Sequence, residues 1–156
     1  MHADLVRATS ERMTAHGAEA SNAPLEVSKD LAELHRGDWQ GIPRTEYARR
    51  WAEEREAYWL APLTWRGHGG ESEADLVERA WPDLLAAAQL APGEAVAVTA
   101  HRQVIRALTA AAVGIGPGAS HRITLDPAHG ILLRDARGGW ILERTNAPCP
   151  GAPHAA

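Results

Sequence analysis

The chain has 156 residues, of which 45% are hydrophobic, and this length predicts one domain with one core. A formal net charge of −4 with interspersed signs gives no basic stripe for a phosphate backbone, which argues against nucleic acid as the main partner, whereas a small anion needs only a local cationic pocket. No run of residues approaches a membrane span and no apolar leader core precedes Leu5, so we expect a cytoplasmic protein without a membrane partner.

Four elements are predicted in the first sixty residues. A helix starts near Asp4, a plausible N-cap, and ends at Gly17. Residues 24–28 are a short candidate strand, and residues 30–41 hold too few periodic apolar positions for a helix, which favours a functional loop. From Thr45 to Leu60 the aromatic residues fall on one side of a further helix.

The middle of the chain contains the clearest helix signal. Ser72 and Asp75 form an S-x-x-D capping box before an amphipathic run, although Pro82 predicts that this helix kinks or restarts. Residues 95–100 are predicted as a buried strand, and a helix follows from about Arg102 to Val113. The glycine-rich residues 114–118 resemble a nucleotide loop, but they follow a helix, which favours a helix C-cap.

Three short strands are predicted at the C-terminal end, over 121–126, 130–135 and 140–144. Strands interleaved with helices indicate an α/β sandwich, here over residues 1–146. Residues 147–156 form a Pro/Ala-rich tail that is expected to be disordered or loosely attached. This tail carries Cys149, the single cysteine, which has no disulfide partner.

Three residues are candidates for chemistry, and each also has an ordinary interpretation. His101 ends the 95–100 strand and precedes a helix, where a side chain points at the crevice above a parallel sheet, but it could equally be a histidine satisfied by backbone. Arg7 could be a solvated helix residue, and Glu33 could be a surface carboxylate.

Four segments together resemble the histidine phosphatase superfamily, which has the phosphoglycerate-mutase-like fold. They are "DLVRA", "LAELHRGDWQG", "GGES" and "VTAHRQVIRAL", in this order and at these separations. The resemblance covers residues 3 to 146 and implies a three-layer sandwich, with a mixed, mainly parallel sheet covered by helices on both faces.

The resemblance also implies the site. It makes Glu33 and His101 the catalytic residues, with Glu33 as the general acid and His101 as the second histidine of the family. It makes Arg7 the phosphate-clamping arginine, places Glu71 and Ser72 in the substrate-binding turn, and puts Arg102, where the family usually has glycine, at the pocket lip. Phosphoryl transfer needs such cations to stabilise the equatorial oxygens and an acid to protonate the leaving oxygen. No metal or cofactor is implied.

One part of the family pattern has no counterpart in these residues. The family begins with a central strand ending in Arg-His-Gly, whose histidine attacks phosphorus, and no Arg-His-Gly occurs in the 156 residues. We therefore expect an N-terminally truncated member that lacks the first central strand, through a start site inside a longer gene (the alternative we favour) or through true loss. The 95–100 strand would then have a bare edge that invites pairing with a second copy.

The expected function is that of a phosphomonoesterase or phosphomutase of small phosphorylated metabolites, which is inactive as these 156 residues because the nucleophile segment is absent. Its ligand is a small phosphorylated molecule or inorganic phosphate. The alternative is a non-catalytic remnant of the same fold that binds an anion or another protein.

Overall fold

A computed structural model describes residues 26–67, 69–90, 95–115 and 118–149. Within them the chain forms the 3₁₀ turns η1 (Lys29–Leu31), η2 (Gly37–Trp39) and η3 (Ser120–Arg122), the helices α2 (Arg44–Arg50), α3 (Ala52–Leu60), α4 (Glu73–Leu90) and α5 (Arg102–Ala112), and the strands β1 (His129–Ala136) and β2 (Gly139–Pro148). The helix predicted from Asp4 lies outside the described residues.

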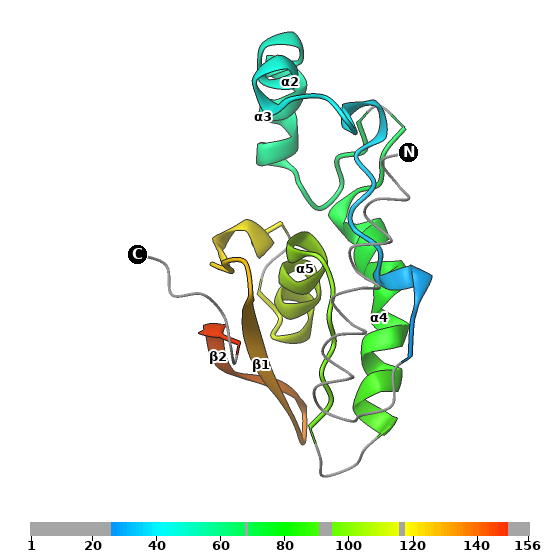
Figure 1. The fold of residues 1–156 in the computed structure, drawn as a ribbon, viewed down its shortest axis with the longest axis vertical. Coiled ribbons are helices and arrows are strands. Elements are labelled where there is room, and N and C mark those ends of the chain that lie inside the picture. The colour runs from blue at the N-terminus through cyan, green and yellow to red at the C-terminus, as the bar shows by residue number, and fades with distance from the viewer. Residues whose placement is uncertain (1–25, 68, 91–94, 116–117, 150–156) are drawn as a thin grey trace.

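Helix α5 lies between α4 and the β1–β2 hairpin (Figure 1). Helix α4 packs along one side of α5, and the β1–β2 hairpin lies on the other side, while α2 and α3 stand together at one end (Figure 1). The loop that contains η1 and η2 runs along α4, so this loop and α5 both approach the same helix. None of the helices in the described part is long and apolar enough to cross a membrane.

The hairpin is present where two of the predicted strands lie. β1 and β2 pair antiparallel, from Ala136 opposite Gly139 to His129 opposite Pro148. β2 therefore extends two residues into the segment expected to be a loose tail, and the amide of Cys149 donates to the carbonyl oxygen of Ala128 at 3.0 Å. Residues 147 and 148, expected to belong to the loose tail, are therefore paired in the hairpin.

Two further predicted strands, 95–100 and 121–126, are not formed in the described part of the chain. Residues 95–100 form no strand, and residues 121–126 begin in η3 instead. Ile123 and Leu125 are buried and Thr124 is exposed. These residues therefore show the alternating burial of a strand, but they do not pair with a neighbouring strand in the described part. A strand needs a neighbour for its backbone hydrogen bonds, and the described sheet consists of β1 and β2.

Helix α4 begins as the capping box predicts. The Ser72 amide donates to Asp75 Oδ2 at 2.8 Å, and the Asp75 amide donates to Ser72 Oγ at 3.2 Å. Pro82 does not restart the helix, since α4 continues to Leu90 with Pro82 inside it. The prediction for α5 is confirmed within one residue, and Gly114 follows it with a φ of 66°, the left-handed conformation of a helix C-cap.

Two predictions in the N-terminal half need correction. The helix predicted over Thr45–Leu60 is divided at Trp51, whose φ of −128° and ψ of 51° are not helical. Residues 26–28 are not a strand. Ser28 caps η1 instead, because its hydroxyl accepts a hydrogen bond from the Asp30 amide at 3.0 Å and so holds the chain in a turn.

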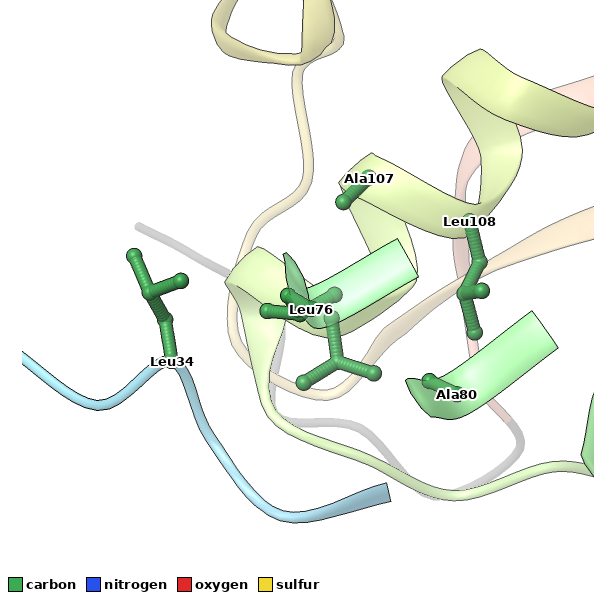
Figure 2. Packing of buried hydrophobic residues seen from close by; sticks show 6 residues of the cluster. Leu34, Leu76, Ala80, Ala107 and Leu108 are labelled. Carbon is green, nitrogen blue, oxygen red and sulfur yellow. The ribbon is translucent and has the colours of Figure 1, made fainter. Parts of the chain in front are cut away.

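The main core lies between the loop, α4 and α5. Its buried members are Leu34, Leu76, Ala80, Val104, Ala107 and Leu108. Figure 2 shows the leucine of the loop facing the side chains of the two helices. Because this loop supplies a fully packed core residue, its position relative to α4 and α5 is set by apolar burial.

Candidate functional site

The loop over residues 30–41 is anchored at two buried side chains, Leu34 and Trp39. Trp39 stacks on Tyr47 of α2 with ring centroids 5.4 Å apart, and it lies 4.9 Å from the ring of Trp65. Since Trp39 also packs among these aromatic rings, the loop is held both at the core and at the α2–α3 end. This confirms an ordered loop where the sequence lacks helical periodicity.

Glu33, the predicted general acid, lies in this loop directly before Leu34. Its side chain is half-buried, and its Oε1 accepts a hydrogen bond from the Leu34 amide at 2.8 Å. Among the described residues, no protein group donates to its second carboxylate oxygen, which leaves that oxygen available to a ligand.

His101, the predicted second histidine, is the N-cap of α5, with a φ of −71° and a ψ of 157°. Its carbonyl oxygen accepts the first helical hydrogen bond, from the Ile105 amide at 3.1 Å. His101 therefore lies at the start of a helix, as predicted, but the apolar residues before it form no strand in the described part.

Glu33 and His101 lie beside the same buried cluster. Leu34 belongs to the cluster and Ala100 packs against it. Consecutive Cα atoms are about 3.8 Å apart, so the residue before Leu34 and the residue after Ala100 both border this cluster. Glu33 and His101, 68 positions apart in the numbering, are therefore each the chain neighbour of a residue in or against this cluster.

A buried polar group fixes the first turn of α5 behind His101. Glu73, only 3% exposed, accepts hydrogen bonds at Oε2 from Ser120 Oγ at 2.6 Å and from Gln103 Nε2 at 3.2 Å. Arg106 Nε donates to the Ser120 carbonyl oxygen at 2.8 Å. Buried polar groups that are satisfied in this way make the position of a helix terminus specific.

Glu71 and Ser72, predicted to bind substrate, make contacts within the protein. Glu71 Oε1 accepts from the His35 amide at 2.8 Å, and Ser72 is 2% exposed and caps α4. These contacts connect the "GGES" turn to the Glu33 loop and to α4. A role for either side chain in substrate binding stays a prediction.

Sequence reasoning missed Arg79, which lies on α4 and contacts the loop. Its guanidinium pairs with Glu71, with Nη2 2.6 Å from Oε1, and donates to three loop carbonyl oxygens. One signal was available in the sequence: an arginine directly before the buried Ala80 lies next to an apolar stripe, where it needs acceptors.

The remaining candidates are cationic. Arg102 is exposed at the first position of α5, and Arg106 follows one turn later. Burial, together with the nearby positive charge of Arg102, lowers the pKa of the Arg106 guanidinium. Arg7 lies outside the described residues. Among the residues that the structure describes, no group of three or more His, Cys, Asp or Glu side chains could hold a metal ion.

Two known enzymes of phosphoglycerate compounds are similar to this chain in sequence. A glucosyl-3-phosphoglycerate phosphatase of Mycolicibacterium vanbaalenii is 36% identical over 104 residues, which are 62% of this chain and 46% of that enzyme. A 2,3-bisphosphoglycerate-dependent phosphoglycerate mutase of Brucella anthropi is 35% identical over 89 residues, 56% of this chain and 43% of the mutase. The chain thus spans about half the length of these relatives.

Solved structures agree with the fold prediction. A mycobacterial glucosyl-3-phosphoglycerate phosphatase in complex with VO₃ superposes with a TM-score of 0.78 and 28% identity, over 88% of this chain and 71% of that one. The predicted phosphoglycerate-mutase-like α/β fold is therefore confirmed. The family model of the histidine phosphatase superfamily (branch 1) matches residues 2–148, and on this match the chain belongs to that superfamily.

Proposed function

We propose that this protein acts on phosphate monoesters of small metabolites, as a phosphomonoesterase or phosphomutase, through a site that includes Arg7, Glu33 and His101. The observation that carries this proposal is the position of Glu33 and His101 beside one buried cluster, to which Leu34 and Ala100 connect them. A general acid and a cationic phosphate ligand must lie close together to serve one phosphoryl group.

The roles follow from the chemistry of the side chains. Arg7 supplies a guanidinium fork for two phosphate oxygens, and His101 in its protonated form supplies a compact cation. Glu33 has one carboxylate oxygen occupied by the Leu34 amide, so its other oxygen delivers the proton to the leaving oxygen of the ester.

A phosphorylated hydroxy acid is the proposed substrate class. The matched phosphatase and the matched mutase are both named for phosphoglycerate compounds. Such a ligand carries a carboxylate besides its phosphate, and the exposed guanidinium of Arg102 beside His101 is suited to pair with it.

The 156-residue polypeptide itself contains no Arg-His-Gly sequence. We propose that this polypeptide alone binds the phosphate group but does not form a phosphohistidine, and that its turnover of p-nitrophenyl phosphate is negligible. Turnover that persists after repurification, with a phosphohistidine mapped to any of its residues, would contradict this.

The site assignment is tested by calorimetric titration of the polypeptide with orthovanadate. Arg7→Ala and His101→Ala should each weaken binding by about tenfold or more, because each removes a charged hydrogen-bond partner of the anion. In the double variant the two losses should be non-additive, since both groups share one ligand.

Matched controls are Arg137→Ala in the hairpin turn and His129→Ala on β1, which remove the same side-chain types elsewhere. Neither control should change the affinity. Vanadate binding that is insensitive to both Arg7→Ala and His101→Ala would refute the site while leaving the family and the fold unaffected.

A further inference from the structure

Arg79 connects helix α4 to the backbone on the N-terminal side of Glu33 and to Glu33 itself. Nη1 donates to the carbonyl oxygen of Asp30 at 2.5 Å, and Nη2 donates to those of Ala32 and Glu33 at 2.9 and 3.3 Å. The geometry of a planar guanidinium fixes the relative positions of these carbonyl groups, which the single ammonium group of a lysine could not reproduce.

Glu71 completes the arrangement on the C-terminal side of Glu33. Its two carboxylate oxygens accept from Arg79, at 2.9 Å from Nε to Oε2 and at 2.6 Å from Nη2 to Oε1. Oε1 also accepts the amide of His35, and the Glu71 amide donates to the His35 carbonyl oxygen at 2.9 Å. The Arg79–Glu71 ion pair therefore holds the backbone on both sides of Glu33.

Neither side chain of this ion pair is fully exposed. The side chain of Arg79 is 25% exposed and that of Glu71 is 17% exposed. A partly buried, bidentate pair with further hydrogen bonds holds its geometry better than an exposed pair does. By contrast, the arginine of the Arg66–Asp75 pair, at the N-terminal end of the same helix, has a side chain that is 65% exposed and donates its hydrogen bonds to Asp75.

We propose that Arg79 and Glu71 are positioning residues for Glu33, which hold its carboxylate where it can meet a bound phosphate group. This inference rests on the proposed function for the role of Glu33, but the effect on the loop is independent of it. The glutamate of the "GGES" turn then serves the reaction through the loop and not by contact with substrate.

The first arm of the test measures hydrogen exchange of the backbone amides. Arg79→Gln should increase exchange in residues 31–36 by about tenfold, because the loop loses its charged hydrogen bonds, while α5 and the hairpin keep their protection. Glu71→Ala should expose the His35 amide, and Glu71→Gln, which retains an acceptor oxygen, should largely restore its protection. Arg66→Gln is the matched control and should leave the loop unchanged.

The second arm measures orthovanadate affinity in a cycle with Glu33→Gln. If Arg79 acts through Glu33, Glu33→Gln should change the affinity several-fold in the original chain and by less than about twofold in the Arg79→Gln background. In the Arg66→Gln background, Glu33→Gln should change the vanadate affinity as much as it does in the original chain.

The two arms separate the outcomes. Faster loop exchange with an additive vanadate cycle, or unchanged loop exchange in Arg79→Gln, would each overturn the positioning role. If the original chain does not bind vanadate, the proposed function is refuted, and so is the role of Glu33 in it. The hydrogen-exchange measurement still shows whether Arg79 holds the loop in place. If Arg79→Gln fails to fold, hydrogen exchange of the His35 amide is compared between Glu71→Gln and Glu71→Ala. Equal exchange in these two variants would overturn the positioning role.

Discussion

His35 and Glu71 exchange two hydrogen bonds, from the His35 amide to the Glu71 carboxylate at 2.8 Å and from the Glu71 amide to the His35 carbonyl oxygen at 2.9 Å. This reciprocal contact joins the loop of the candidate acid to the turn that starts α4. It requires a close approach at Gly70, where a Cβ atom would lie 2.7 Å from the His35 carbonyl oxygen and 3.0 Å from the Gly37 nitrogen.

Gly70→Ala is expected to separate the loop from the turn and to destabilise the protein, because the atoms that a Cβ would meet are backbone atoms. Thermal unfolding and vanadate titration measure the two effects. Gly69→Ala is the comparison, since Gly69 has a φ of 70° but open space around it, and its cost should be the backbone strain of about 1–2 kcal/mol. Vanadate affinity that falls in Gly69→Ala but not in Gly70→Ala would contradict this account.

The capping box predicts a defined dependence of stability on pH. Hydrogen bonds from Arg66 and Ser72 hold the pKa of Asp75 well below its ordinary value of 3.8. The contribution of this carboxylate is therefore present above about pH 3.8 and is lost as the pH falls from there through the lower folded-state pKa.

Ser72→Ala should cost about 1 kcal/mol of stability at pH 7, as is typical for a lost N-cap. Asp75→Asn should also be destabilising at pH 7, and its difference from the original chain should shrink below the ordinary pKa. Urea unfolding at pH 7 and at a pH below the ordinary pKa of Asp75 measures the stability of both variants. A difference for Asp75→Asn that grows in acid would show that the carboxylate is not stabilised in the folded state.

Local signals in the sequence predicted local structure well. The Ser72–Asp75 capping box, the hairpin and the start of α5 after His101 each depend on residues close together in the chain, and the structure has them in place. The motif positions also led to the correct superfamily.

Interactions between distant residues were not predictable in the same way. The pattern of 95–100 indicates a strand, but a strand also requires a neighbour, and none pairs with it in the described part. Arg79 contacts carbonyl groups more than forty positions away, and backbone acceptors leave no trace in the sequence. Glu71 and Ser72 matched a binding motif, and the motif alone does not distinguish contact with ligand from contact with the loop.

The apolar segment 95–100 leads to a prediction about association. Val96 is 41% exposed in a segment without a paired neighbour among the described residues. We expect the 156-residue polypeptide to self-associate through this segment, and Val96→Lys to reduce the association, because a charge at an unpaired edge opposes strand pairing. Light scattering over a range of concentrations measures it.

Ile141→Lys is the matched control for this prediction, since Ile141 is 42% exposed but lies on the paired strand β2. It should leave the association unchanged. A monodisperse monomer for the original polypeptide at all concentrations would show that residues 95–100 do not pair with a second copy.

Arg102 is expected to affect selectivity between ligands. Arg102→Ala should weaken binding of 3-phosphoglycerate by about tenfold and that of inorganic phosphate much less, because only the first ligand has a carboxylate with which the guanidinium could pair. Competition titrations against vanadate give both affinities, with Arg137→Ala as the control. An equal loss for the two ligands would place Arg102 at the phosphate instead.

Whether Glu33 and His101 face one bound anion, as proposed, can be measured by nuclear magnetic resonance of the two side chains. Orthovanadate is titrated into protein labelled at the glutamate carboxyl carbons and histidine ring nitrogens, while the signals of both residues are followed. Both signals should shift and saturate at the same vanadate concentration, and the signals of His129 and Glu143 in the hairpin should stay unchanged. Saturable binding that shifts neither Glu33 nor His101 would contradict it.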